Sequence, residues 1–199
     1  TMDIASFLVQ ALNGLAAASS LFLVAAGLSL IFGVSRIVNF AHGSFFMLGV
    51  YVAYSLVSHA APAVSAALNV VVSDTASQTA AYFLMLLCAA FITGVLGALV
   101  EVLLLRRIYK APELFQLLAT FALVLVMQDG TLWLWGAEDL LGPRAPGLGG
   151  AVDILGRRFP TYDLFLIAIG PVVLAVLWWC LQRTRFGMLV RAATQDRDM

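Results

Sequence analysis

The side chains best suited to chemistry in this sequence are ionisable and amide groups set inside long apolar runs. Asp129 follows Gln128 near the middle or outer half of one run, and Glu101 lies close to the end of another. A charge inside a bilayer is costly, so such carboxylates line a polar pathway or pair with a neighbouring group. For Gln128 and Asp129, a polar pathway and an inter-helix hydrogen bond both stay open. For Glu101 we favour snorkelling to the interface or a salt bridge. The basic residues available for that bridge are Arg36, Arg106 and Arg107.

Asn39 and His42 form a second polar pair, and on a helix their spacing would place them on one face. A histidine in a membrane helix can relay protons. With no carboxylate nearby in sequence, however, His42 is more typical of a hydrogen-bonding strut.

The sequence carries no recognisable catalytic or metal-binding motif. It has no Gly-x-x-x-x-Gly-Lys phosphate loop, so we expect no ATP hydrolysis by this chain. It also lacks a His-Glu-x-x-His motif and a Gly-x-Ser-x-Gly nucleophile elbow. Cys88 and Cys180 lie in apolar runs, without the Cys/His spacing of a metal site. An enzyme is therefore poorly supported.

The elements that must position these groups are five apolar stretches. Hydrophobic residues make up 62% of the 199-residue chain and charged residues 11%, far below the roughly 25% of a soluble domain. Each stretch approaches the ~20 residues that cross a bilayer, and none alternates as a membrane strand would. The predicted fold is therefore an all-α, polytopic membrane helical bundle. The five predicted spans are 14–34, 37–58, 80–105, 115–136 and 163–182.

Basic residues are shared unevenly between the connections. Arg106, Arg107 and Lys110 precede the fourth span, and four arginines lie between 183 and 197. The positive-inside rule places both clusters in the cytoplasm. The loop 137–162, with mixed charge, Pro and Gly, is predicted to be irregular and on the opposite side, as is the N-terminus. Residues 60–73 are apolar but short and could be interfacial or re-entrant, and the glycines in 37–58 could break that span.

The stretch from Gly27 to Tyr51, GLSLIFGVSRIVNFAHGSFFMLGVY, resembles the permease subunits of high-affinity branched-chain amino acid ABC importers. In that family an apolar helix ends in a glycine, followed by Asn-Phe-Ala-His-Gly and a Met-Leu-Gly-x-Tyr run. The corresponding residues here are Gly33, Asn39 to Gly43 and Met47 to Tyr51. The segment Val100 to Arg107 is similar to the family's glutamate-bearing helix end.

The last residues, Leu181 to Met199, resemble the cytoplasmic loop by which these permeases dock on their ATPase. The resemblance implies that residues 1–199 form one permease domain, incomplete at its C-terminus, with 183–199 as the docking loop.

The residue pattern independently indicates a short helix after Gly187, with a polar side and an apolar side. Arg191, Gln195, Asp196 and Arg197 would be exposed, while Met188, Leu189, Ala192 and Ala193 would pack on a neighbour. Without the resemblance, an interfacial segment with solvated charges would be preferred. The candidate ATPase-coupling residues are Gly187, Arg191, Ala192, Gln195 and Asp196.

The resemblance implies a permease for branched-chain or related amino acids in the bacterial inner membrane. It further implies a second permease subunit, two cytoplasmic ATPases that use ATP, and an extracytoplasmic solute-binding protein; no cofactor is expected in this chain. The candidate pathway residues are Asn39, His42, Gly43, Gln128 and Asp129. Two alternatives stay open. One is a permease of the same family for urea or another small polar solute. The other is a self-sufficient channel or proton-coupled carrier that uses Asp129, Glu101 and His42.

Overall fold

The computed structural model describes residues 4–35, 39–70 and 73–195, which are mostly helical. Within these residues, five helical segments are long and apolar enough to cross a membrane. They are Ile4–Gly33, Ala41–Leu68, Asp74–Ile108, Glu113–Trp135 and Thr161–Arg183. The predicted all-α, polytopic membrane architecture with five spans is therefore confirmed.

The chain divides into two compact units. The terminal unit joins Thr1–Ile37 to Gly147–Met199, and the central unit is Val38–Pro146. Each unit contains its own helix contacts.

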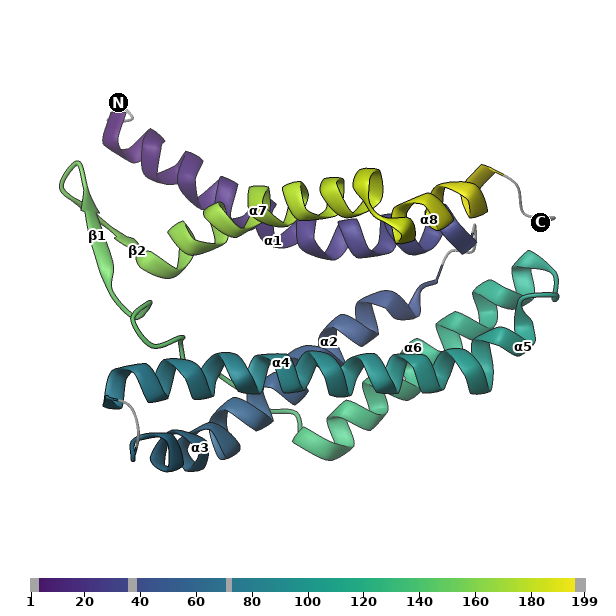
Figure 1. Cartoon of the computed structure of the whole chain (residues 1–199), viewed down its shortest axis with the longest axis horizontal. Helices are drawn as coiled ribbons and strands as arrows, with labels where there is room; N and C mark the ends of the chain where they lie inside the picture. Colours follow the sequence, from purple (N-terminus) through teal and green to yellow (C-terminus); the bar gives the residue numbers. More distant parts are fainter. Residues whose placement is uncertain (1–3, 36–38, 71–72, 196–199) are drawn as a thin grey trace. The chain divides into compact units, whose positions relative to one another are not determined.

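In the terminal unit, α1 (Ile4–Ser35) and α7 (Thr161–Arg183) run side by side (Figure 1). The two helices meet closely at Gly170, where an added Cβ would lie 2.8 Å from Ser19 Oγ. Ser19 and Ala16 are both buried on α1. Small residues at such a crossing let two helices approach closely in lipid. The helix α8 (Arg185–Gln195) then turns back and contacts both α7 and α1.

The loop 137–162 was predicted to be irregular, and this was wrong for its second half. Strands β1 (Ala151–Ile154) and β2 (Arg157–Pro160) form an antiparallel hairpin. Leu155 and Gly156, at φ 51° and 79°, make the two-residue turn with positive φ that hairpins favour. Asp153 is paired with Arg158 across the strands, and opposite charges in such positions stabilise the pair.

The central unit begins with one long helix in three parts: α2 (Ala41–Ser55), the π-helical turn η1 (Leu56–Ala60) and α3 (Ala61–Leu68). The predicted span 37–58 was therefore too short. Residues 61–68 continue it rather than forming an interfacial or re-entrant segment, and the glycines do not break it. Pro62 is tolerated because it lies in the first turn of α3, directly after the widened turn.

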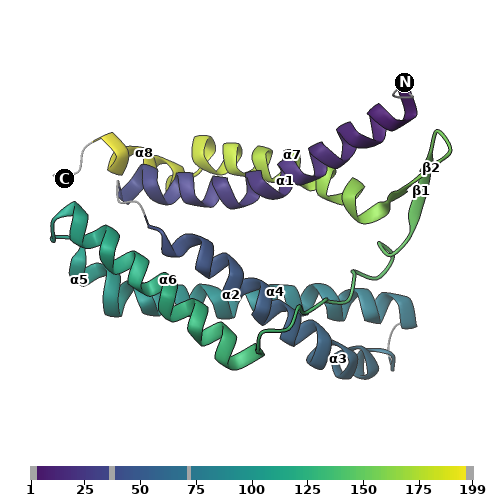
Figure 2. The same ribbon diagram turned by 180° about the vertical axis from the view of Figure 1, so that it is seen from behind.

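The rest of the central unit is a hairpin of two further long helices. The first comprises α4 (Asp74–Val100), the π-helical turn η2 (Glu101–Leu105) and α5 (Arg106–Ile108), and the second is α6 (Glu113–Trp135). Figure 2 shows α2 lying against both α4 and α6. The contact with α6 includes a hydrogen bond, in which Trp135 Nε1 donates to Ser55 Oγ over 2.7 Å. Tyr51 also packs on the Trp135 ring.

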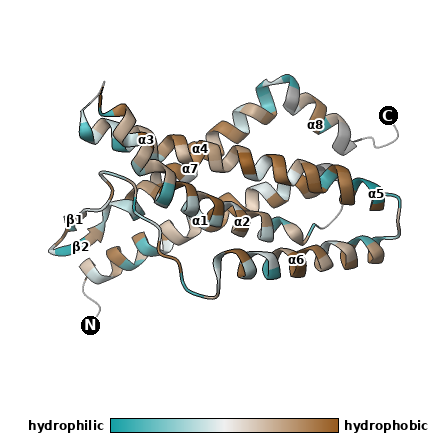
Figure 3. Cartoon of the chain, turned by 90° about the horizontal axis from the view of Figure 1, so that it is seen from below, coloured by the Kyte–Doolittle hydropathy of each residue, from teal (hydrophilic) through white to brown (hydrophobic). Residues whose placement is uncertain are grey.

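The helix surfaces are strongly apolar, and the hydrophilic residues gather at the turns and the hairpin (Figure 3). Large side chains such as Phe91 and Trp133 are 73% and 84% exposed. Apolar surface this extensive needs a lipid or protein cover. Helix α1 starts at Ile4, not at the predicted residue 14, because residues 4–13 are also apolar and contain no helix breaker.

Candidate functional site

The first candidate region is the start of α2. Asn39 lies just before the helix, where its Oδ1 accepts the Ala41 N–H over 3.0 Å. Its backbone carbonyl accepts the His42 N–H over 3.2 Å. Asn39 therefore closes an Asx-type turn that starts the helix. The expected helical pair of Asn39 and His42 on one face is not formed, because Asn39 is outside the helix. His42 is half-buried and Gly43 is exposed.

The contacts between α2 and α4 show how far along α4 the start of α2 lies. An added Cβ at Gly97 would meet the Phe45 ring at 3.9 Å, and one at Gly49 would meet Thr93 at 3.6 Å. The two helices are thus antiparallel, and one further turn places Ala41 level with Glu101. The helix that carries Glu101 continues to Ile108, which is about 10 Å farther at 1.5 Å per residue. The start of α2 is therefore recessed below the end of its neighbour.

Glu101 has a different partner from those predicted. Within the described residues, the Tyr109 hydroxyl donates a hydrogen bond to its carboxylate, in place of a salt bridge to Arg106 or Arg107. Arg36 lies outside the described residues. Burial raises the pKa of Tyr109, and the hydrogen bond and negative charge of Glu101 raise it further. The phenol therefore stays protonated at neutral pH and remains a donor to Glu101.

A buried glutamine holds the short turn between α5 and α6. Gln116 Nε2 donates to the carbonyl oxygens of Tyr109 and Ala111, over 3.1 and 2.7 Å. Gln116 is only 7% exposed, so these bonds are shielded from water. This turn carries Lys110 and directly follows Arg106 and Arg107 of α5.

We expect Gln116→Leu to lower stability by about 1–3 kcal/mol, because two carbonyl groups lose their donor. Thermal unfolding of the purified protein in detergent would measure this loss. Gln128→Leu is the matched control, since Gln128 is exposed and should tolerate the change. Equal unfolding temperatures for the two variants would contradict the role assigned to Gln116.

The second candidate region is the pair Gln128 and Asp129 on α6. Both side chains are exposed on the isolated chain and have no partner among the described residues. The expected hydrogen bond to a neighbouring helix is thus not formed within these residues. A carboxylate without a partner has a high free-energy cost in the hydrocarbon of a bilayer. The role of this pair in a polar pathway stays a prediction.

The third candidate region is the corner between α7 and α8, which is tightly built. Gly187 is buried, and an added Cβ there would lie 2.1 Å from the Leu181 carbonyl oxygen. At the corner, Thr184 Oγ1 donates to the Cys180 carbonyl over 2.5 Å and accepts the Gly187 N–H over 3.2 Å. No other residue type fits at Gly187 without moving one helix away from the other.

Arg191 reinforces this corner. Its guanidinium donates to the Leu181 carbonyl and, over 3.2 Å, to Gln182 Oε1. A cation at a helix C-terminus is also favoured by the helix dipole. Arg191 is exposed as predicted, but its side chain is bonded to the end of α7.

The two faces of α8 differ from the prediction. Met188 and Leu189 were expected to pack on a neighbour, but they are 62% and 69% exposed, and Ala192 is exposed too. Among the described residues of α8, Gly187 is buried and lies in close contact with α7. Gln195 is the last residue of α8, and Asp196 lies outside the described residues.

Sequence reasoning missed two features near these regions. Tyr109 was not predicted as the partner of Glu101. The spacing could have indicated it, because a residue eight positions farther along a helix lies about two turns away on the same side. A cavity in the central unit, lined by residues of η1, α3, α4 and the loop after α6, was also missed. No cluster of metal-binding side chains occurs in the part of the chain that the structure describes.

These features define a multi-pass membrane protein with a short helix tightly attached to the end of its fifth span. Residues 10–199 match the family described as branched-chain amino acid transport system / permease component, and the chain belongs to that family. No solved structure matches the chain.

Individual relatives are distant but are matched along nearly the whole chain. The high-affinity branched-chain amino acid transport system permease protein LivH of Salmonella typhimurium is 23% identical over 97% of this chain. The corresponding protein BraD of Pseudomonas aeruginosa is 22% identical over 99%, and LivH of Escherichia coli is 22% identical over 97%. The match spans 60% of the length of each LivH relative and 62% of BraD.

Proposed function

We propose that this chain is a transmembrane permease subunit of an ABC importer. It would move branched-chain or related amino acids across the bacterial inner membrane, driven by ATP hydrolysed in partner subunits. The proposed assembly contains a second permease subunit, two cytoplasmic ATPases and an extracytoplasmic solute-binding protein. Membership of the transport permease family and the names of the relatives support the substrate class.

The observation that carries the coupling role is the rigid corner at Gly187. A helix that is to transmit force must move together with the span that it drives. The backbone contact of Gly187 with Leu181, and the Arg191 bond to the same carbonyl, provide that connection. The exposed Met188 and Leu189 side chains then give α8 an apolar face that suits a groove on a soluble ATPase.

The proposed mechanism is alternating access driven through this connection. Nucleotide can shift the permease between outward- and inward-open states only if the ATPase states bind those conformations with different affinity. Movement of α8 would then be passed to α7. With five spans, α8 and the basic α5–α6 turn would lie on one side of the membrane, and by the positive-inside rule that side would be the cytoplasm.

We further propose that Asn39, His42 and Gly43 line part of the translocation pathway. The recessed position of Asn39, which lies outside the helix, supports this, because non-helical backbone at membrane depth is tolerated where it lines a cavity. Gln128 and Asp129 are assigned to the same polar surface, because their side chains would otherwise be exposed to the hydrocarbon of the bilayer.

A proton-coupled carrier is the second candidate function, favoured by the partner-free Asp129 among the described residues. Uptake of L-leucine into proteoliposomes separates the two proposals. The importer requires the ATPases and ATP and is unaffected by a protonophore. Uptake by this protein alone, abolished by a protonophore, would overturn the importer and support the carrier.

A further inference from the structure

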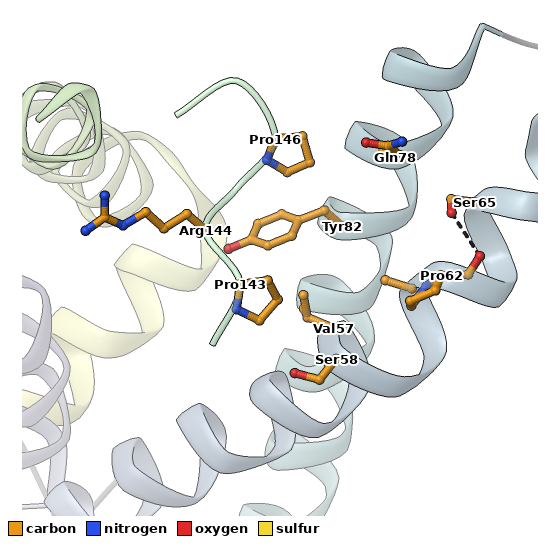
Figure 4. A pocket seen from close by; sticks show the side chains of 10 residues that line it. Val57, Ser58, Pro62, Ser65, Gln78, Tyr82, Pro143, Arg144 and Pro146 are labelled. Atoms are coloured by element: carbon orange, nitrogen blue, oxygen red, sulfur yellow. Dashed lines mark hydrogen bonds between the residues drawn. The ribbon is translucent and has the colours of Figure 1, made fainter. Parts of the chain in front are cut away.

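The central unit contains a cavity that none of the assignments above uses. Its volume is about 400 Å³, and it lies between the η1–α3 helix, the first half of α4 and the loop after α6. Cavities of about 300–1,000 Å³ are typical of small-molecule sites. Figure 4 shows the Tyr82 ring projecting from α4 toward the loop that carries Pro143 and Pro146.

One wall of the cavity is apolar and stiff. Val57, Ala61 and Pro62 contribute from the helix, and Pro143 and Pro146 face them from the loop. Val57 is only 7% exposed, so it is fixed in position by its packing. Such a wall suits a compact, branched aliphatic group.

In the helix next to this wall, one backbone carbonyl lacks its usual helical donors. In the π-helical turn, the Ala61 N–H bonds to the Leu56 carbonyl instead of the Val57 carbonyl. The other helical donor that could reach Val57 would come from residue 62, which is proline and has no N–H. The Val57 carbonyl therefore lacks both helical donors. A carbonyl in this state favours a ligand that carries an ammonium or another donor.

Polar groups suited to an anion line the cavity from α4 and from the loop. Gln78 and Tyr82 project from α4 toward the loop, and Arg144 is the charged residue of the lining (Figure 4). Arginine is the side chain that binds carboxylates most effectively, through two parallel hydrogen bonds. In this structure the Arg144 side chain extends away from Tyr82, so binding would require it to turn inward.

We propose that this cavity binds an α-amino acid with a branched aliphatic side chain before translocation. The ammonium is held at the Val57 carbonyl, the carboxylate at Arg144, and the side chain against Val57, Ala61 and Pro62. The cavity lies toward the end of the unit opposite to the basic α5–α6 turn, which is the outer end in the proposed orientation. The inference therefore rests on the proposed function, which supplies the orientation of the chain in the membrane and the class of substrate.

Saturation binding of tritiated L-leucine to the full-length complex in lipid nanodiscs tests the cavity. Ala61→Leu adds bulk at the apolar wall of the cavity and should weaken binding roughly tenfold or more. The matched control is Ala63→Leu, on the same helix but exposed and outside the lining, which should bind as the wild type does. Wild-type affinity in Ala61→Leu, or no saturable binding to the unaltered complex, would overturn the proposal.

Arg144→Gln provides a second test that does not depend on folding around a larger side chain. It should weaken binding of L-leucine but leave competition by L-leucinol, which lacks the carboxylate, unchanged. Equal L-leucine binding by the variant and the wild type would show that Arg144 does not bind the carboxylate. Cross-linking of α8 to the ATPase is measured on the same samples. If α8 cross-links to the ATPase while Ala61→Leu binds L-leucine normally, only the cavity assignment is wrong. If α8 does not cross-link while the complex binds L-leucine, the importer proposal is wrong.

Discussion

Gly187→Ala is expected to uncouple ATP hydrolysis from uptake in the assembled transporter. The new Cβ would lie 2.1 Å from the Leu181 carbonyl oxygen and 2.5 Å from that of Cys180. Because both obstacles are backbone atoms, they cannot rotate away, and α8 must separate from α7. Uptake should then fall by roughly 5- to 150-fold, the range of typical coupling free energies of about 1–3 kcal/mol.

The measurement is ATP-driven uptake by the complex in proteoliposomes, together with co-purification of the ATPase. Gly14→Ala is the matched control, because an added Cβ there meets nothing within 4 Å. It should transport normally, and the helix should gain slightly in stability. If Gly187→Ala also transports at the wild-type rate, the rigid connection between α7 and α8 is refuted.

Gly170→Ala is expected to have the largest effect on stability. Its Cβ would meet Ser19 Oγ at 2.8 Å and Ser19 Cβ at 3.1 Å, inside the α1–α7 crossing. Ser19 is only 7% exposed, so it has little room to move. Overpacking of this kind costs about 1–3 kcal/mol, which should appear as a lower unfolding temperature in detergent.

A second substitution on α1 makes this prediction specific to the crossing. Ser19→Gly removes both obstructing atoms, so the double variant Ser19→Gly, Gly170→Ala should recover most of the lost stability. The helix-propensity cost of the new glycine is largely offset by the gain at residue 170. Failure of the second change to restore the unfolding temperature would show that the crossing is not the source of the loss.

The five spans could be predicted from sequence because hydropathy alone decides what lies in lipid. Their ends could not be predicted with the same accuracy. Residues 61–68 are helical because a widened turn ahead of Pro62 lets the helix continue, and a hydropathy profile contains no information about that turn. The hairpin after α6 was missed for a similar reason: a two-residue turn at Leu155 and Gly156 is a local signal within a mixed loop.

The candidate site was less predictable than the fold because it depends on contacts between elements. The spacing of Asn39 and His42 suggested a shared helix face, but the Asn39 side chain bonds to Ala41 and begins the helix instead. Similarly, the amphipathic pattern of α8 identified a short helix but not which of its residues would pack within this chain. The close approach permitted by Gly187 leaves Met188 and Leu189 exposed.

The central claim, that α8 is a cytoplasmic contact for an ATPase, is tested most directly by a single cysteine at Leu189. In a background with Cys88 and Cys180 replaced, Leu189→Cys should cross-link to an ATPase subunit in membranes. It should also resist a membrane-impermeant maleimide added outside the cell. Leu155→Cys in the hairpin, which is 65% exposed, is the control and should show the opposite labelling. Labelling of Leu189→Cys from outside, without capture of an ATPase, would contradict the account.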